Sequence, residues 1–213
     1  MTSHNRRHSS PRSGGFTLVE MSIVLAIVAL LLGGLLPVIS SQVEMQRRNE
    51  TRKYLDIVRD ALVGYAVLNG RLPCPDSNDD GIAEATCTTN ASQVGTLPYT
   101  DLGVVGTDAY DNVLIYAVTK EFAATTPFTL NTAGVIKVCD AGCASDWTNK
   151  STAVIVSRGA NAATATSADE TENTDGDTIF ISRDFAQDGY DDLIVWLSPN
   201  TLFNRMVAAG KLP

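Results

Sequence analysis

The feature that most constrains this chain is an uncharged apolar run close to its N-terminus. Residues 21–39 are nineteen consecutive residues without a charged side chain. As a helix that rises about 1.5 Å per residue, this run would extend for roughly 28 Å, which is close to the hydrocarbon thickness of a bilayer. We therefore expect a membrane-spanning helix at the start of the chain.

Two simpler interpretations of the run are a cleaved secretory signal and a plain membrane anchor. A secretory signal has an apolar core of about 7–15 residues before a small-residue cleavage site. The run here is longer, although residues 38–40 would serve as such a site. A plain anchor gives no reason for the carboxylate of Glu20, which lies four residues after Phe16. Because a carboxylate at membrane depth costs a few kcal/mol unless it is paired, Glu20 is a candidate functional residue. The alternative is a carboxylate that is solvated at the headgroup edge.

A short motif opens the apolar run. Residues 14–21 read GGFTLVEM and follow a leader with three arginines and no acidic residue. This pattern resembles the class III signal of type IV pilins and type II secretion pseudopilins. The resemblance implies that residues 1–15 are a leader, which a prepilin peptidase removes by cutting after Gly15, and that the new amino group of Phe16 is methylated. It also implies that Glu20 pairs with this amino group on a neighbouring subunit, which offsets the desolvation of both charges in a filament core.

The same resemblance implies a location and a set of partners. The chain would be a single-pass protein of the bacterial inner membrane with its head in the periplasm. Its partners would be the lipid bilayer, the prepilin peptidase, an inner-membrane assembly platform and other pilin or pseudopilin subunits. The product would be a type IV pilus or a type II secretion pseudopilus, and machines for secretion, motility, adhesion and DNA uptake all use such subunits.

The apolar part of the helix contains the residues with the poorest helix propensity. Glycine costs about 1 kcal/mol and proline about 3 kcal/mol relative to alanine inside a helix. Gly33, Gly34 and Pro37 therefore predict a kink or an unwound turn. In similar filaments this region bends or unwinds on assembly, whereas the alternative is that Gly and Pro are simply common in membrane helices.

The helical pattern continues beyond the apolar run. Apolar residues recur at three- and four-residue steps until an Asn-Gly pair at 69–70 predicts a stop. From residue 16 to residue 69 the helix would be about 80 Å long, far more than a bilayer requires. We expect residues 16–40 to form the transmembrane part of a stalk and residues 41–69 an amphipathic part that docks on a globular head.

Residues 70–213 have the pattern of a β-rich head. Short runs of β-branched and aromatic residues predict strands at residues 113–119, 135–138, 153–156, 179–181 and 193–197. No segment with a helical period between them is long enough for a parallel crossover, so an antiparallel sheet is expected. The fold class is therefore α+β, with a long N-terminal helix packed on an antiparallel sheet, as in pilins.

The C-terminal part of the head predicts one helix and one loop. Ser198 is a helix cap and Pro199 suits the first helical position, so a short helix is expected to begin there and to stop at Gly210. Residues 159–177 have few large apolar side chains and predict an exposed, mobile loop.

A second motif extends the resemblance into the head. Residues 108–116, DAYDNVLIY, look like a divergent form of the Asp-Pro-Trp-Gly-Asn-Pro-x-x-Tyr signature of major pseudopilins, with Asp108, Asn112 and Tyr116 kept. The departures from the signature favour a minor subunit. Glu20 argues against the tip position, since the pseudopilin thought to sit at the tip usually lacks this acid.

The four cysteines of the head predict disulfides. Without a head histidine or a Cys-x-x-Cys pair, a metal site is disfavoured, and an exported head would be oxidised. Three connectivities are possible, and the most economical one pairs Cys74 with Cys87 and Cys139 with Cys143. Free structural thiols are the alternative.

The loop that follows Cys74 resembles half of a calcium site. Asp76, Asn78 and Asp80 place oxygen ligands at alternate positions and Gly81 suits the sharp turn, but Cys87 stands where the closing glutamate would be. Calcium is therefore a possible ligand of this loop, and solvated acidic turns are the commoner alternative.

Composition excludes several functions for the head. Removal of the three leader arginines takes the net charge of the chain from −8 to −11, which argues against nucleic-acid binding. Both histidines lie in the leader, so no Ser-His or Cys-His pair remains, and no phosphate loop or dinucleotide motif is present. The chain is therefore not expected to be an enzyme. The alternative to a filament subunit is a membrane-anchored adhesin or binding module that does not polymerise.

Overall fold

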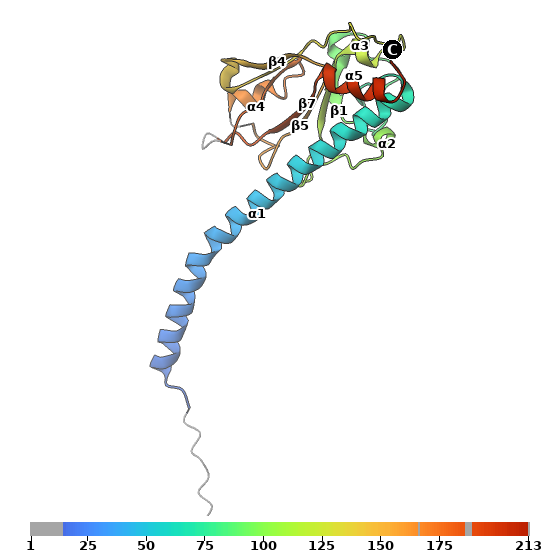
Figure 1. The fold of residues 1–213 in the computed structure, drawn as a ribbon. Coiled ribbons are helices and arrows are strands. Elements are labelled where there is room, and N and C mark those ends of the chain that lie inside the picture. Colours follow the sequence, from blue (N-terminus) through green and yellow to red (C-terminus); the bar gives the residue numbers. More distant parts are fainter. Residues whose placement is uncertain (1–14, 166, 186–188, 213) are drawn as a thin grey trace, which may run out of the picture. The chain divides into compact units, whose positions relative to one another are not determined.

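The computed structural model describes residues 15–165, 167–185 and 189–212, and the side chains of residues 34–39, 91 and 92 lie outside this description. The chain divides into two compact units, Met1–Glu44 and Met45–Pro213. Helix α1, Leu18–Asn69, begins in the first unit and ends in the second (Figure 1).

The first unit contains the beginning of α1. The helix starts at Leu18, two residues later than predicted. The backbone N–H of Glu20 donates to Oγ1 of Thr17 at 3.2 Å, so the threonine satisfies one of the amides that the start of a helix leaves free. The hydroxyl of Ser22 donates to the carbonyl of Val19 at 2.8 Å, one turn back along the helix.

The apolar part of α1 differs from the prediction in one respect. The helix is continuous across Gly33, Gly34 and Pro37, so the predicted unwound turn is not found in this part of the chain. A bend on filament assembly stays a prediction. A search of the described residues finds no helix with a stretch long and apolar enough to cross a membrane. Residues 34–39 of the predicted span lie outside the described side chains.

The second unit is built around a four-stranded antiparallel sheet. Its strand order is β1-β2-β5-β7, formed by β1 (Val94–Thr96), β2 (Ile115–Val118), β5 (Ala153–Ser157) and β7 (Leu193–Leu197). Because side chains alternate between the two faces of a strand, this sheet buries apolar residues on both sides.

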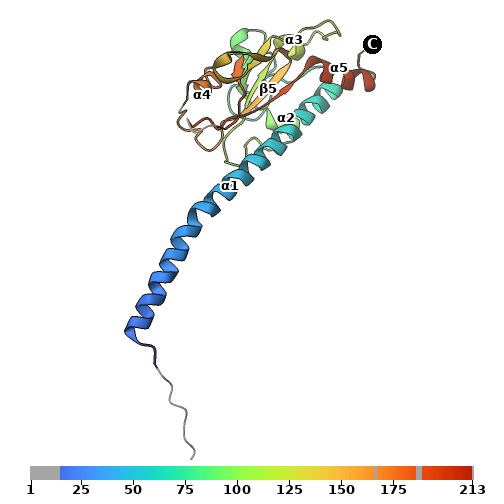
Figure 2. The ribbon, with the colours of Figure 1, turned by 60° about the vertical axis from the view of Figure 1, so that its left-hand side comes forward.

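One face of this sheet packs against helices. The buried cluster on this face includes Leu55, Val58 and Leu62 of α1 together with Tyr116 of β2 and Ile155 of β5. Helix α5 (Pro199–Ala208) completes the cluster with Leu202 and Met206. Figure 2 shows the end of α1 running along this unit beside α5. Three short helices, α2 (Tyr99–Leu102), α3 (Lys120–Ala123) and α4 (Ala168–Glu172), and two 3-10 turns, Asn90–Gln93 and Ala141–Cys143, join the strands.

The other face of the four-stranded sheet packs against a second, smaller sheet. Its order is β4-β3-β6, formed by β3 (Ile136–Cys139), β4 (Asp146–Ser151) and β6 (Ile179–Ile181). Ile136, Val138 and Phe180 from this sheet are buried against Val154 and Val156 of β5. The second unit therefore has a helical layer and two sheet layers.

The predicted α+β fold, with a helix packed on an antiparallel sheet, is confirmed in part, and the structure differs from the prediction in two ways. There are two sheets, and β3 and β6 pair in parallel. Two parallel strands need a long connection between them, which is usually a helix. Here the connection runs through β4, β5 and α4 instead. Strands β1 and β4 were not predicted, because β1 has three residues with a central glycine and β4 reads DWTNKS, mostly exposed and polar.

The two edges of the four-stranded sheet differ. At the β1 edge, the backbone N–H of Asp76 donates to the carbonyl of Thr96 at 3.0 Å, and the N–H of Thr96 donates back to Asp76 at 2.9 Å. A Cβ on Gly95 would lie 2.5 Å from the carbonyl oxygen of Asp76, so only glycine allows this approach. The β1 edge is therefore closed by the chain itself, whereas β7 is the last strand at the other edge.

The predicted C-terminal helix is confirmed, and the predicted exposed loop is correct only in part. The hydroxyl of Ser198 accepts the N–H of Thr201 at 3.2 Å, and α5 begins at Pro199. Residues 159–177, expected to form an exposed loop, contain α4. A capping box between Ser167 and Glu170 starts this helix, and only 2% of Glu170 is exposed.

The structure pairs the cysteines locally, Cys74 with Cys87 and Cys139 with Cys143. The first pair closes a separation of 13 residues and the second a separation of 4. Replacement of both cysteines of the first pair by alanine is expected to lower the free energy of unfolding by about 3 kcal/mol, and the same change in the second pair by about 2 kcal/mol, because a longer closed loop restrains the unfolded chain more.

Urea unfolding of the two double variants measures this difference. The wild-type chain without reductant is the reference. A second-pair variant that is clearly less stable than the first-pair variant would contradict the loop-length explanation.

Candidate functional site

The residues of the predicted processing site lie together in an open segment. Residues 15–17 precede α1 and are not helical, so the peptide bond between Gly15 and Phe16 lies just before the helix. Apart from its chain neighbours, no atom of the described residues lies within 4 Å of the position that a Cβ on Gly15 would take, and 74% of Phe16 is exposed. An unhindered, non-helical backbone of this kind is what a protease needs at its cleavage site.

Glu20 lies one turn beyond this bond and is exposed. It stands in the first turn of α1, where the positive end of the helix dipole favours a negative charge. Thr17 and Glu20 have the Thr-x-x-Glu spacing of a capping box, and the first of its two hydrogen bonds, from the Glu20 N–H to Thr17, is present. Glu20 therefore lies in the first turn of the helix, and it is close in sequence to Phe16, whose amino group cleavage after Gly15 would free.

Of four basic residues at the beginning of the second unit, two contact aromatic rings and two are exposed. The guanidinium of Arg48 lies 4.4 Å from the ring centre of Phe185, and that of Arg47 lies 5.8 Å from the ring centre of Tyr110. These contacts are cation–π interactions within the head unit. Arg52 and Lys53, in contrast, are exposed and make no ion pair among the described residues.

The residues kept in the segment 108–116 are the ones that fix it to the fold. The carboxylate of Asp108 accepts the N–H of Asn112 at 3.0 Å and the hydroxyl of Ser157 at 2.5 Å. The side-chain amide of Asn112 donates to the carbonyl of Gly159 at 2.6 Å, and the hydroxyl of buried Tyr116 donates to the carbonyl of Pro73 at 3.1 Å. Three side chains of the divergent signature therefore have structural roles at the start of β2.

The loop predicted to bind calcium is held by its own backbone. One carboxylate oxygen of Asp76 accepts the N–H groups of Asn78 and Asp79 at 3.0 Å and 2.8 Å, and the other accepts the N–H of Gly81 at 2.6 Å. The amide of Asn78 donates to Asp80 at 3.1 Å. These bonds explain the acidic residues of the loop without an ion. Calcium binding by Asp76, Asn78 and Asp80 stays a prediction.

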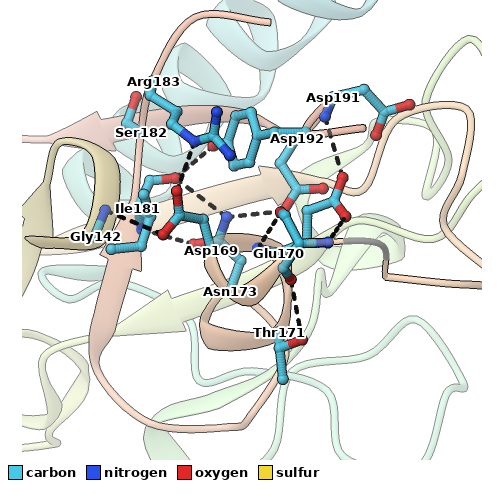
Figure 3. Close-up of polar contacts among 12 residues, drawn as sticks. Gly142, Asp169, Glu170, Thr171, Asn173, Ile181, Ser182, Arg183, Asp191 and Asp192 are labelled. Atoms are coloured by element: carbon cyan, nitrogen blue, oxygen red, sulfur yellow. Dashed lines mark hydrogen bonds and ion pairs between the residues drawn. The ribbon is translucent and has the colours of Figure 1, made fainter. Parts of the chain in front are cut away.

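A buried polar network that the sequence analysis missed attaches α4 to the strands. Figure 3 shows Asp169, Glu170 and Asn173 from the α4 region facing Arg183 and Asp192. Asp169 forms an ion pair with Arg183, with 2.6 Å between nitrogen and oxygen, and the guanidinium of Arg183 lies 4.2 Å from the ring centre of Tyr190. The α4 region therefore contacts both Arg183, just after β6, and Asp192, just before β7.

Asn173 lies at the centre of this network. Its side-chain nitrogen donates to the carbonyl of Ile181 at 3.1 Å and to the carboxylate of Asp192 at 2.8 Å. Its side-chain oxygen accepts the N–H of Ile181 at 2.7 Å (Figure 3). Only 1% of Asn173 is exposed. Its side chain therefore provides the hydrogen bonds that water cannot supply to three buried groups.

Three carboxylates of this network lie close together in the interior. Oxygens of Glu170, Asp191 and Asp192 lie within 4.8 Å of one another. Burial raises the pKa of Asp192 from 3.8 to about 7, an effect that nearby Glu170 and Asp191 increase and that the hydrogen bond from Asn173 opposes. A proton can therefore be held at Asp192 in the folded chain under mildly acidic conditions.

A sequence signal for this network was present. Ser167 and Glu170 have the Ser-x-x-Glu spacing of a capping box, which predicts a helix start inside the segment that was expected to be a loop. The partners of this helix could not be found in the same way, because Asp191 and Asp192 lie some twenty residues further along the chain and resemble ordinary acidic turn residues.

Residues 10–36 match the family model of the prokaryotic N-terminal methylation motif, which is the signature of the prepilin-type signal of type IV pilins and pseudopilins. This match confirms the resemblance found from residues 14–21. No curated protein and no solved structure matches the chain.

Proposed function

We propose that this chain is a structural subunit of a type IV pilus or a type II secretion pseudopilus. The methylation motif at residues 10–36, joined directly to a long helix that ends in a folded head, is the observation that carries the proposal. The motif supports a pilin-like or pseudopilin subunit that is processed at its N-terminus. The divergent segment 108–116 favours a minor subunit.

The first step in this function is cleavage after Gly15 and methylation of Phe16 by a prepilin peptidase. The open, non-helical backbone at this bond and the helix that begins at Leu18 support this step. Cleavage here removes the leader and leaves the apolar part of α1 attached to the head.

The second step is insertion and assembly through α1. Apolar side chains between Phe16 and Leu32 are extensively exposed, with 89% of Leu18 and 77% of Leu30 accessible. A continuous apolar surface of this kind needs a nonpolar partner. We assign it to the lipid of the inner membrane before assembly, with the head in the periplasm, and to neighbouring α1 helices in the filament. The inner-membrane assembly platform would move the subunit from one environment to the other.

Co-expression with a prepilin peptidase, followed by intact-mass measurement, tests the processing step. The expected product begins at Phe16 and carries one added methyl group. A product that keeps its leader, or one that is cut after Ser40, would show that the central proposal is wrong.

The carboxylate of Glu20 is expected to be needed for assembly but not for cleavage. Glu20→Gln keeps the shape of the side chain and removes its charge, so the pair with the amino group of Phe16 on the next subunit is lost. Incorporation into filaments, measured by immunoblotting of sheared fractions, should fall by about tenfold or more, since loss of one partner of a buried pair costs about 3–5 kcal/mol.

Glu50→Gln is the matched control, because it removes a carboxylate from an exposed position of the same helix. It should leave incorporation unchanged. If the Glu20 variant assembles normally, or if the head works without residues 1–40, the alternative of a membrane-anchored module that does not polymerise would be favoured.

A further inference from the structure

The smaller sheet ends at a strand whose free edge is covered by one side chain. The order of this sheet is β4-β3-β6, so β6 has no neighbouring strand on its other side among the described residues. At Ile181, Asn173 takes the place of that strand. Its amide nitrogen donates to the carbonyl of Ile181 at 3.1 Å, and its amide oxygen accepts the N–H of Ile181 at 2.7 Å (Figure 3). Because a paired strand exchanges these same two bonds, Asn173 covers the β6 edge as a strand would.

The segment that carries Asn173 is attached to the head by polar contacts. We name residues 167–177, which contain α4, the α4 segment. It reads SADETENTDGD, without a large apolar side chain. Asp169 contributes an ion pair with Arg183 at 2.6 Å and a hydrogen bond from the N–H of Gly142 at 3.1 Å. A segment with little apolar burial can open locally while the rest of the head stays folded.

Two of the three buried carboxylates in this attachment are surrounded by donors. Glu170 accepts the side-chain amide of Asn161 at 2.9 Å. It also accepts the backbone N–H groups of Ser167 and Asp191, each at 3.1 Å. Asp191 accepts the N–H groups of Ala160 and Asn161 at 2.7 Å and 3.2 Å. Donors that point at a carboxylate stabilise its ionised form, so both acids are expected to be charged in the folded chain.

The third carboxylate, that of Asp192, has a different environment. It accepts a single hydrogen bond among the described residues, from Asn173 at 2.8 Å. Its oxygen lies within 4.8 Å of oxygens of Glu170 and Asp191, and only 3% of Asp192 is exposed. Burial and two nearby negative charges raise the pKa of Asp192 to about 7. The folded cluster therefore binds one proton at Asp192, and Asn173 joins this carboxyl to the β6 edge.

The basic groups around Asp192 do not remove the need for this proton. The other titratable groups that face Asp192 lie on the elements packed around it: Tyr190 beside β7, Arg158 after β5, Arg183 and Asp184 after β6, and Arg52 of α1. Arg183 is paired with Asp169, and Arg52 and Asp184 are both exposed. Arg158 lowers the pKa of Asp192, but burial has a larger effect. Tyr190 stays neutral, because burial raises its pKa.

We propose that the α4 segment is a pH-operated cover of the β6 edge, which is closed while the carboxylate cluster holds one proton and opens when that proton leaves. When Asp192 ionises, three negative charges lie within 4.8 Å of one another in the interior. Their repulsion is relieved if the α4 segment carries Glu170 into water. Asn173 moves with the segment, so the backbone groups of Ile181 become free to bond with water or with another strand.

Hydrogen exchange of the full chain in detergent tests this proposal. The measured quantity is the opening constant of the amides in residues 168–175, corrected for the intrinsic dependence of exchange on pH. In the open form Asp192 returns to its ordinary pKa of 3.8, whereas the closed form holds the proton up to about pH 7. The closed form therefore loses stability as the pH rises, and the opening constant should increase by about tenfold between pH 6 and pH 8.5.

The strand at the centre of the larger sheet supplies an internal reference. Strand β5 lies between β2 and β7, so its amides exchange only when the whole head unfolds. They should have smaller opening constants than the α4 segment at both pH values.

Two variants separate the role of Asp192 from that of other acids. Asp192→Asn removes the titrating group and keeps an oxygen for the bond from Asn173, so its α4 segment should open equally at pH 6 and pH 8.5. Asp175→Asn is the matched control, because Asp175 is an exposed carboxylate of the same segment, and it should show the increase of the wild type.

The proposal is overturned if the α4 amides of the wild type open equally at the two pH values, or if Asp192→Asn keeps the increase. It is also overturned if the α4 and β5 amides have the same opening constants, since the proton would then act on unfolding of the whole head and not on a local cover. These outcomes are independent of the processing and assembly tests, because the α4 segment lies in the unit Met45–Pro213.

Discussion

Asn173→Ala is expected to lower the free energy of unfolding by about 3–5 kcal/mol, because it leaves buried polar groups without partners. The change removes both bonds to the backbone of Ile181 and the bond to Asp192. Water cannot easily replace the amide, since only 2% of Ile181 and 3% of Asp192 are exposed. The loss should therefore exceed that of an ordinary surface hydrogen bond several-fold.

Urea unfolding followed by circular dichroism measures this effect. Asn204→Ala is the matched control, since Asn204 is exposed on α5 and should change stability by less than about 0.5 kcal/mol. If both variants unfold at the same urea concentration, Asn173 does not hold α4 in place as the contacts indicate.

Asp192→Asn is expected to remove a pH dependence from the stability of the head. Burial raises the pKa of Asp192 from 3.8 to about 7, so the folded chain binds this proton more tightly than the unfolded chain does. The stabilisation is fully present below about pH 3.8 and is lost as the pH rises through about 7. Across this interval the carboxyl should contribute a fall of about 2–4 kcal/mol in the free energy of unfolding.

Unfolding curves at several pH values, for the wild type and for Asp192→Asn, measure this contribution as the difference between two slopes. Asparagine keeps an oxygen that can accept the hydrogen bond from Asn173, so the geometry of the network is retained. Asp60→Asn, at an exposed position of α1, should leave the slope unchanged. A wild-type stability that rises with pH across this interval in comparison with Asp192→Asn would contradict the assigned direction of the shift.

The elements predicted from sequence are those with a strong local signal. The end of α1 at Asn69, the cap of α5 at Ser198 and strand β7 were all predicted, because an Asn-Gly stop, a Ser-Pro cap and a β-branched run each act within a few residues. Strand β4 could not be predicted in this way, because its polar residues form a strand only by pairing with β3.

The candidate site likewise has one part that a local sequence signal predicts and one part that it does not. Gly15, Phe16 and Glu20 form one short motif, which sequence alone identifies and which lies within the residues 10–36 that the family model matches. Their roles in processing and assembly stay predictions. The network around Asn173 joins residues that are far apart in the chain, and its chemistry depends on burial, which single-sequence patterns do not encode. The contacts of Arg47 and Arg48 could not be predicted either, because nothing in the sequence around them indicates which aromatic rings of the head they contact.

The closed β1 edge has a consequence wherever many copies of this chain lie close together. A sheet with two open edges can join copy to copy without end, which is the geometry of a fibril. With Asp76 covering β1, a strand added at β7 completes the sheet and leaves no second place on the same molecule for growth. The Asp76 bridge therefore limits edge-to-edge pairing through this sheet to two copies, and it prevents the sheet from extending into an open-ended aggregate.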